Sequence, residues 1–355
     1  MKWGEFTIGD LFSINTYKKR FDANKVEVHQ LGTYPYVVRM GSNNGQKGFI
    51  NEDPKFLNEG NTISFGQDTA TMFYQEKPYF TGDKIKILKP KEKRFGKKNA
   101  QFFIAAMMKS FISFSWGSSS YSVDVIKNQK VTLPILSNKK IDFDIIESLL
   151  AEIESNRINQ LENYLLNNGL NDYQLTEQEK QALENFEKLD WNIFNLENLF
   201  GKSTRGRRLK SADRVTGTLP FITAGETDEG VSAFIGNDVK VFSANTITID
   251  MFGSAKYRNF KYGGDDHIAV VHTDKLPKYA SVFVTSAIHK SSYNGQFNYG
   301  RNFYAKDADA LDISLPVKDG KPDYGTMETV ISAIHKLVIK DVILYIEKKK
   351  KELNN

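Results

Sequence analysis

The chain has 355 residues, with 40% hydrophobic and 12% aromatic content, a formal net charge of +5 and no cysteine. This composition excludes a disordered chain, and the lack of cysteine excludes disulfides, thiolate chemistry and cysteine-ligated zinc. No apolar run reaches the roughly 18 residues that a membrane helix needs, and the opening "MKWGEF" is not a signal peptide, so we expect a cytoplasmic protein without a membrane partner.

Charge is unevenly distributed along the chain. Residues 1–140 hold 22 Lys and Arg against 12 Asp and Glu, a net charge of +10, whereas residues 141–190 hold 3 against 12, a net charge of −9. A basic first third suggests a polyanionic partner, because Lys and Arg surfaces bind phosphate backbones with release of counterions. The alternative is a lysine-rich surface that serves only solubility.

Residues 1–140 are expected to form a first domain, a mixed sheet with at least one helix. The segments "YPYVV", "NTISF" and "KIKIL" are rich in β-branched and aromatic residues and are bounded by Gly, Asn and Asp, which predicts short strands. A helical stretch follows at 99–112, and the domain closes with "VTLPI" at 131–135.

Residues 141–190 are expected to form a long helix and a short helical linker. The helix, at 142–166, places one broad apolar face at Ile146, Leu149, Ile153, Ile158, Leu161 and Leu165. Further on, Thr176 with Glu179 three residues later predicts a capping box that starts the short helix.

Residues 191–320 repeat the first domain in order and spacing. The matched pairs include "WGEFTIGDLF" (3–12) with "WNIFNLENLF" (191–200), "GNTISFG" (60–66) with "ANTITID" (244–250), and "LGTYPYVVRMGSNNGQKGFI" (31–50) with "TGTLPFITAGETDEGVSAFI" (216–235). We therefore predict a second domain with the same fold as the first.

The remaining residues, 321–355, are expected to form a second long helix. A spacing of 4-3-4-3-4, typical of a seam against another helix, relates Met327, Ile331, Ile334, Val338, Asp341 and Tyr345. The predicted fold class is α+β (mixed α/β), with two pseudo-repeated globular domains joined by two long antiparallel helices. We expect these helices to form a coiled-coil-like spacer with pseudo-two-fold symmetry.

The sequence lacks the motifs of several common catalytic sites. "LFGKST" (199–204) resembles a phosphate-binding loop, but Leu196 stands where the first glycine is required. The chain has no Gly-x-Ser-x-Gly elbow, which a serine hydrolase would need. It also has no adjacent prolines, which the Pro-Pro-aromatic loop of an amino-methyltransferase would need. Asp265, Asp266 and His267 lie close together, and a metal-dependent nuclease or hydrolase using them is the alternative function, although a turn before a strand explains them better. We expect no catalytic residue, metal or cofactor in this chain.

The loops between the matched segments differ between the two copies and are rich in groups that bind nucleic acid. Arg, Lys, Asn, Gln, Ser and Thr reach base edges, and Lys and Arg hold phosphates; the alternative is that these loops are only solvated turns. The candidate DNA-binding residues are Lys18, Lys19, Arg20, Arg39, Asn43, Asn44, Gln46, Lys47, Gln67, Thr69, Ser118, Ser119 and Tyr121 in the first copy, and Arg205, Arg207, Arg208, Lys210, Glu226, Lys256, Tyr257, Arg258, Tyr293, Asn294, Arg301 and Asn302 in the second.

The doubled layout resembles the specificity subunit of Type I restriction–modification enzymes and the equivalent subunit of the related Type IIB systems. The resemblance rests on the two openings, the paired glycine-rich loops, "NTISFG" with "NTITID", and "VTLPI" with "ISLPV". It implies a non-catalytic subunit in which each domain, a target recognition domain, reads one half of an asymmetric, bipartite site in double-stranded DNA.

The same resemblance implies the partners. The helices would set the gap between the half-sites and dock DNA methyltransferase subunits, which would bind S-adenosylmethionine, with a restriction or translocase subunit as a further candidate. The second copy differs from a DNA-binding domain with a uniformly basic surface, because its loop "GETDEG" is acidic. Glu226 either accepts a hydrogen bond from a cytosine amino group or points away from DNA. A protein–protein adaptor without DNA contact is the remaining alternative.

Overall fold

The computed structural model describes residues 1–111 and 121–353. The chain divides into two compact units, Met1–Leu161 with the chain end from Lys350, and Glu162–Lys349. We call them unit 1 and unit 2 and describe each by itself. The domain boundaries predicted from the sequence stay a prediction. No helix within the described ranges is long and apolar enough to cross a membrane.

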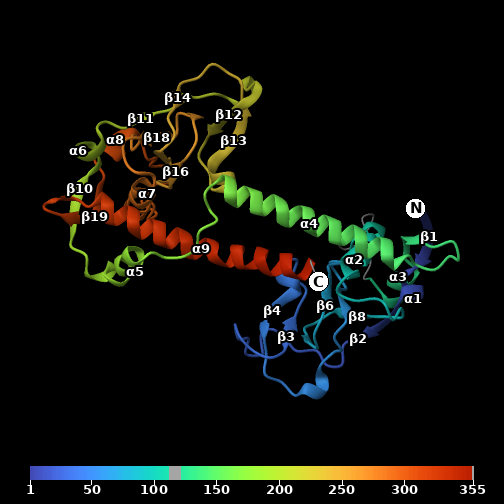
Figure 1. Ribbon diagram of the computed structural model, residues 1–355. Helices are drawn as coiled ribbons and strands as arrows, with labels where there is room; N and C mark the ends of the chain where they lie inside the picture. The colour runs from blue at the N-terminus through green and yellow to red at the C-terminus, as the bar shows by residue number, and fades with distance from the viewer. Residues whose placement is uncertain (112–120, 354–355) are drawn as a thin grey trace. The chain divides into compact units, whose positions relative to one another are not determined.

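Unit 1 contains two sheets, a separate strand pair and several helices (Figure 1). Its elements are β1 (Lys2–Thr7), α1 (Ile8–Leu11), β2 (Phe12–Thr16), β3 (Pro35–Val37), η1 (Asn43–Gly45), β4 (Gln46–Phe49), η2 (Pro54–Phe56), β5 (Thr62–Gly66), β6 (Met72–Gln75), β7 (Phe80–Thr81), β8 (Ile85–Pro90), α2 (Ala100–Ser110), α3 (Val123–Asn128), β9 (Lys130–Ile135) and most of α4 (Phe143–Asn167).

Unit 2 follows the same plan and adds a short helical segment at its start. Its elements are α5 (Glu177–Glu184), η3 (Phe186–Lys188), β10 (Trp191–Asn195), α6 (Leu196–Phe200), β11 (Thr204–Arg205), η4 (Ser211–Asp213), β12 (Thr216–Ile222), η5 (Thr227–Gly230), β13 (Val231–Ile235), β14 (Val241–Phe242), β15 (Thr246–Asp250), β16 (Ala255–Arg258), β17 (Tyr262–Gly264), β18 (Ile268–Val271), α7 (Lys278–Ser292), α8 (Ala305–Asp309), β19 (Asp312–Lys318), β20 (Lys321–Pro322) and α9 (Tyr324–Leu353).

Strand order confirms the repeat. Unit 1 has an antiparallel sheet β2-β8-β5-β6, a sheet β4-β3-β7 and the pair β1-β9; unit 2 has β11-β18-β15-β16, β13-β12-β17-β14 and the pair β10-β19, which β20 extends. Each second sheet holds one parallel pair, β3 with β7 and β12 with β17. Helix α2 packs against β6 and β9, as α7 packs against β16 and β19. The predicted mixed fold, written twice, is therefore confirmed.

The central strands of the repeats are buried for the same reason. Every residue of β5 and of β15 is buried, as a strand flanked by sheet neighbours and covered by a helix requires. The polar members of each strand are satisfied by hydrogen bonds. Thr62 donates to the Glu59 carbonyl and also bonds the Tyr79 hydroxyl at 3.1 Å.

The equivalent contacts recur in unit 2. Thr246 donates to the Ser243 carbonyl and bonds the Tyr262 hydroxyl at 2.9 Å. Because each threonine has one proton, already given to the carbonyl, the tyrosine hydroxyl is the donor in both pairs. Burial raises the pKa of Tyr262 to about 12 and also raises the pKa of Tyr79. Both hydroxyls therefore remain protonated donors at neutral pH.

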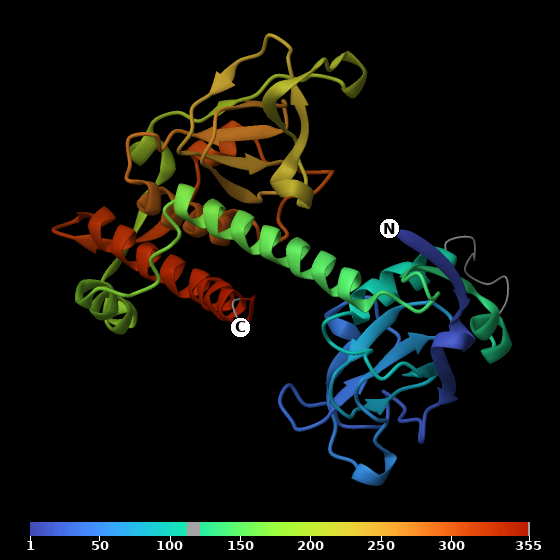
Figure 2. The same ribbon diagram turned by 45° about the vertical axis from the view of Figure 1, so that its right-hand side comes forward.

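The long helices α4 and α9 are continuous in both views (Figures 1 and 2). In α9 the buried residues are Met327, Val330, Ala333 and Ile346. The first two belong to the core of unit 2, so the helix begins by packing on its own repeat.

The seam positions predicted by the heptad-like spacing are mostly exposed. Val338 is 72% exposed, and Ile334, Asp341 and Tyr345 are exposed as well. On α4, the predicted apolar face is buried at Ile146, Ile158 and Leu165 but exposed at Leu149 and Ile153. Of the predicted seam positions on α9 only Met327 is buried, so the packing of this face against another helix stays a prediction.

Candidate nucleic-acid interface

Two loops of unit 2 that carry predicted DNA-binding residues, 223–230 and 250–260, meet at Asp250, the buried last residue of β15. Its Oδ1 accepts hydrogen bonds from the backbone N–H groups of Phe252, at 2.9 Å, and Ser254, at 3.0 Å. Its Oδ2 accepts the N–H of Gly225 at 3.4 Å. An aspartate that satisfies neighbouring N–H groups forms a local turn. One carboxylate thus ties the 223–230 loop to the 250–254 turn.

A third loop, 290–304, lies against the same turn. The Ser292 hydroxyl donates to the Gly253 carbonyl at 2.6 Å, and the Phe303 N–H donates to the Met251 carbonyl at 2.9 Å. Gly253 has a φ of +87°, and a Cβ there would meet the Ser292 carbonyl oxygen at 2.2 Å. Only glycine fits this approach, so the two loops are locked together at one point.

The basic loop at 202–210 joins this surface through the turn between β17 and β18. Asp265 accepts the backbone N–H of Leu209 at 3.2 Å, and the Arg207 N–H donates to the Gly264 carbonyl at 2.9 Å. The Arg205 guanidinium lies 6.0 Å from the centre of the Tyr304 ring, which links it to the 290–304 loop. Four loops that are distant in sequence therefore form one connected surface in unit 2.

Arg205, Arg207, Arg208 and Lys210 are all exposed on the basic loop. Arg205 makes one weak ion pair, at 3.6 Å, with Asp266. An ion pair of this length at an exposed site contributes little to stability. The loop backbone is fixed while its cations face solvent, as an anion-binding surface requires.

The 223–230 loop presents an ordered acid. Glu226 accepts a hydrogen bond from the Lys256 ammonium at 3.1 Å, and Lys256 also bonds the Ser254 hydroxyl at 2.9 Å. Partial burial raises the pKa of Glu226, but the hydrogen bonds from Ser254 and Lys256 outweigh it, and the net pKa is lowered. Glu226 is therefore an ionised acceptor held in place by Lys256, which is itself largely covered.

In unit 1 the predicted loops meet at Asp68. Arg39 from the 39–48 loop and Lys84 from the turn after β7 both bond its carboxylate, Lys84 at 2.9 Å. Arg20 bonds Asp83 at 3.4 Å. Arg20 and Arg39 line a hollow of about 360 Å³ together with Phe21, Tyr36 and two acids, Asp22 and Asp83. The hollow places two cations, with two acids beside them, at the junction of the loops.

The amide side chains of the 39–48 loop serve partly to shape it. Asn43 Nδ2 donates to the Gln46 carbonyl at 2.8 Å, and Asn44 Nδ2 donates to the Tyr74 carbonyl at 3.1 Å. Both residues are exposed, as is Lys47. One of the two N–H groups of each carboxamide is engaged by the backbone, which leaves the second N–H and the carboxamide oxygen for a base contact.

Most of the predicted DNA-binding residues lie at the surface or partly exposed, but two do not. Tyr121 is 7% exposed and packs against Phe65 in the core of unit 1, with ring centres 5.8 Å apart. Arg258 is 1% exposed. Their assignment as surface contacts was wrong, because each side chain turns into the interior. Ser118 and Ser119 lie outside the described residues.

Tyr299 is a surface residue that the sequence reasoning missed. It is 86% exposed at the tip of a turn closed by two backbone hydrogen bonds between Asn298 and Arg301, at 2.9 and 3.0 Å. Its ring contacts Phe252 edge to face, with centres 5.2 Å apart. The signal was present in the repeat, since an aromatic residue followed by glycine also stands at Trp116, which lies outside the described residues.

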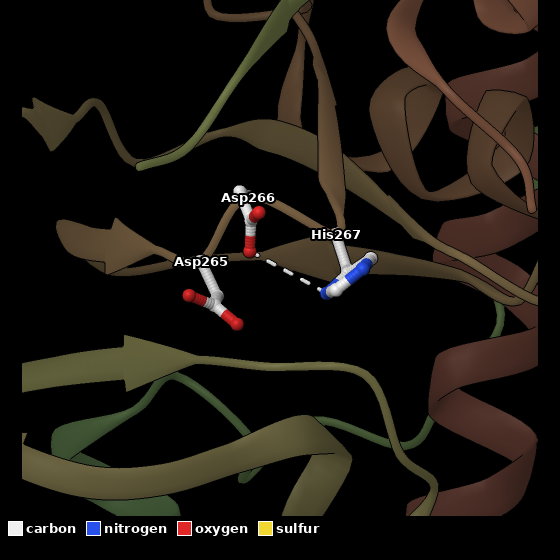
Figure 3. Close-up of side chains that lie close together, drawn as sticks. All are labelled: Asp265, Asp266 and His267. Atoms are coloured by element: carbon white, nitrogen blue, oxygen red, sulfur yellow. Dashed lines mark ion pairs between the residues drawn. The ribbon is translucent and has the colours of Figure 1, made fainter. Parts of the chain in front are cut away.

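The acidic cluster considered for catalysis is accounted for by local structure. Atoms of Asp265, Asp266 and His267 lie within 4.8 Å of one another, and Figure 3 shows the ion pair between Asp266 and His267, which spans 3.4 Å. Asp265 already accepts the Leu209 N–H. In unit 1 the corresponding Asp83 likewise bonds Arg20. The shared role of this turn is to hold the preceding basic loop.

Comparisons with known proteins agree with this layout. The model of the family described as the Type I restriction modification DNA specificity domain matches residues 1–163 and again 188–351. The chain is 27% identical over 345 residues to the specificity subunit of the Type II restriction enzyme BgcI of Heyndrickxia coagulans, covering 96% of each chain.

Solved structures show a similar fold. The crystal structure of the Type I restriction–modification S subunit from M. genitalium aligns with a TM-score of 0.64 and 16% identity, covering 100% of this chain and 92% of that one. The HsdS subunit from Thermoanaerobacter tengcongensis aligns with a TM-score of 0.31 and 11% identity, covering 98% of this chain and 91% of that one. The likeness of fold rests on the first of these.

Proposed function

This chain belongs to the family of Type I restriction modification DNA specificity domains, and from that membership we propose that it reads a two-part DNA sequence with one repeat for each part. It is a non-catalytic DNA-recognition subunit. The observation that carries the proposal is that the repeats share a frame and differ in their loops. Thr62 with Tyr79 and Thr246 with Tyr262 are the same buried contact, yet the loops beside them carry opposite charge.

In unit 2 we propose that the connected loop surface faces DNA. Its cations would contact phosphates and its polar side chains would contact base edges. The residues are Arg205, Arg207, Arg208, Lys210, Glu226, Lys256, Tyr257, Tyr293, Asn294, Arg301 and Asn302, with Tyr299 added. Glu226, ionised and oriented by Lys256, suits a cytosine amino group, which is a donor in the major groove.

In unit 1 we propose the corresponding surface around the hollow at Arg20 and Arg39. The Lys19 ammonium lies over the rings of Phe21, at 4.7 Å, and Phe56, at 4.5 Å, so it is held at this surface by cation–π contacts. The residues are Lys18, Lys19, Arg20, Arg39, Asn43, Asn44, Gln46, Lys47, Gln67 and Thr69. Arg39 suits a guanine, because an arginine side chain can donate two hydrogen bonds to the major-groove edge of that base.

We further propose that the long helices bind the partner subunits and set the distance between the half-sites. An apolar stripe at helical spacing is exposed along α9, formed by Ile334, Leu337, Val338, Leu344 and Tyr345. Exposed apolar patches of this kind mark protein interfaces. The proposed partners at this stripe are methyltransferase subunits, which bind S-adenosylmethionine. Where restriction accompanies modification, a restriction subunit is a further partner. In this proposal the assembly works in the cytoplasm.

The direct test is selection from random duplex DNA by the chain in complex with its methyltransferase partner. The proposal expects an enriched motif of two defined parts separated by a fixed number of undefined base pairs. Enrichment of one continuous motif, or of none, would reject it.

A further inference from the structure

Two buried polar side chains occupy the same place in the two repeats. Gln75 ends β6 and faces Thr62 across the sheet, and Arg258 ends β16 and faces Thr246. Gln75 is 4% exposed and Arg258 is 1% exposed. Polar side chains this deeply buried require hydrogen-bond partners.

Both side chains find equivalent partners. Gln75 Nε2 donates to the Ser64 hydroxyl at 3.1 Å and to the Asn44 carbonyl at 3.1 Å. Arg258 Nε donates to the Thr248 hydroxyl at 2.9 Å, and its Nη2 donates to the Glu229 carbonyl at 2.8 Å. Each residue therefore joins a central strand to a carbonyl in the glycine-rich loop of its own repeat.

The carbonyl that receives the bond lies in a strained part of each loop. Asn43, Asn44 and Gly45 have φ values of 48°, 53° and 72°, and Asp228, Glu229 and Gly230 have values of 48°, 54° and 81°. Three consecutive residues in the left-handed region are unusual, because side chains other than glycine disfavour it. Such a backbone persists only where the surroundings impose it.

The two loops need this support to different degrees. Asn44 tolerates the left-handed region well, and its own side chain is bonded to the Tyr74 carbonyl. Glu229 is a poor residue for this conformation, and here the donor is a guanidinium, whose charged hydrogen bond is the stronger kind. The stronger donor thus stands in the repeat whose loop has the weaker intrinsic preference.

Stability alone does not explain Arg258. Burial lowers its pKa, although Tyr262, Glu229 and Asp250 act in the opposite direction. Its buried Nη1 has no hydrogen-bond partner among the residues that the structure describes. A buried cation without full pairing is often less stabilising than an apolar side chain of similar size.

We infer that Gln75 and Arg258 are positioning residues that hold the 39–48 and 223–230 loops in the conformation that reads DNA. The inference rests on the proposed function of these loops. Neither residue touches DNA; each acts through a loop carbonyl, so its loss should relax base discrimination in one half-site and leave phosphate contacts unchanged.

The first test uses the chain alone and measures amide hydrogen exchange. Arg258→Met removes the donor and keeps an apolar side chain of similar length. We expect the amides of Thr223 and Val231, which donate to the Gly230 and Asp228 carbonyls, to exchange at least about fivefold faster, the effect of losing one buried hydrogen bond. Adding Glu229→Gly should restore slow exchange, because glycine adopts the left-handed region freely.

Thr246→Val is the matched control. It removes the buried hydrogen bonds to Tyr262 and Ser243 on the same strand pair but breaks no loop contact. It should leave the exchange of Thr223 and Val231 unchanged. If Arg258→Met does not fold, Arg258→Lys, which keeps the charge but cannot make both bonds, takes its place. Unchanged loop exchange in a folded variant would overturn the inference.

The second test uses the complex with the methyltransferase partner and duplexes altered one base at a time. Arg258→Met should reduce discrimination at one half-site by about fivefold or more, out of the roughly 5- to 150-fold that a mismatch costs, with the salt dependence of affinity unchanged. Gln75→Met should do the same at the other half-site. Faster loop exchange with undiminished discrimination would overturn the positioning role. If the wild-type complex selects no sequence, the proposed function fails. The exchange result still decides whether Arg258 holds the 223–230 loop in its conformation.

Discussion

The 39–48 loop of unit 1 and the 223–230 loop of unit 2 follow the same backbone path with opposite chemistry. Both pass through three left-handed residues ending at Gly45 or Gly230. The first carries Arg39 and Lys47, a charge of +2, whereas the second carries three acids, a charge of −3. The path is set by buried donors beneath the loop, so the exposed residues are free to differ. The same backbone framework can therefore present two different sets of side chains to DNA.

The repeats also differ in how each holds its long helix. In unit 1, Arg94 bonds Asp144 and Glu147 at the start of α4 directly from the globular repeat. In unit 2, the extra helix α5 intervenes, and its buried Glu179 accepts from Ser332 of α9 at 2.7 Å and from Lys336 at 3.1 Å. Helix α5, which has no counterpart among the described residues of unit 1, thus anchors α9 within unit 2.

The largest expected effect is on the basic loop of unit 2. Replacing Arg205, Arg207 and Arg208 by alanine should weaken DNA binding on the order of 100-fold and lower the salt slope by about 2.7, because three phosphate contacts are lost. Affinity measured over a salt series checks this. Lys318→Ala with Lys321→Ala, at the exposed β19–β20 hairpin, is the control. An unchanged slope in the arginine variant would remove these residues from the interface.

The next effect concerns the exposed stripe of α9. Val338→Glu should weaken assembly with the methyltransferase partner by about 10- to 100-fold, since it places a charge in an apolar interface. Ser286→Glu, at an exposed position of α7 and not on the stripe, introduces the same residue and should change assembly little. Sedimentation or titration of the purified subunits measures both. Equal behaviour of the two variants would refute the stripe as the docking face.

A smaller effect is expected from Tyr299, the exposed aromatic residue of unit 2. Tyr299→Ala should lower DNA affinity by about tenfold, the scale of one lost aromatic–base contact. Tyr299→Phe should retain nearly all of it, because the ring and its contact with Phe252 are kept. A hydroxyl-dependent loss, with phenylalanine as poor as alanine, would argue against stacking.

The smallest effect tests the shared frame. Tyr79→Phe and Tyr262→Phe should each reduce the free energy of unfolding of their own unit by about 1 kcal/mol. The two losses should agree closely, because the buried hydrogen bond to Thr62 or Thr246 is the same. Chemical denaturation followed by amide hydrogen exchange in each unit reports on the two units separately. A large difference would mean that the frame is not equivalent.

Much of the fold was predictable from the sequence because it is written twice. The repeated order fixed the matching strands, and the capping box at Thr176 and Glu179 is confirmed by both of its hydrogen bonds. Heptad-like spacing predicted a seam along α9 that includes Val338, but Val338 is exposed. Spacing alone does not say what covers the face of a helix.

The side chains that turn inward could not be predicted. "SSSYS" has the composition of a solvated loop, yet Tyr121 packs in the core. Arg258 stands in "AKYRNF", where charge suggests the surface, but its place opposite Thr246 puts it beneath the 223–230 loop. Whether a polar side chain points to solvent or to a loop carbonyl depends on tertiary contacts that composition does not encode.

The most direct test of the account is a chimera in which residues 1–140 are replaced by a second copy of 191–320. The chimera, assembled with the methyltransferase partner, is put through the same DNA selection as the wild-type chain. If each repeat reads its own half, the selected site should contain the same word in both halves, the one that unit 2 contributes in the wild type. An unchanged, asymmetric site would contradict the claim that the loops of each repeat determine what that repeat reads.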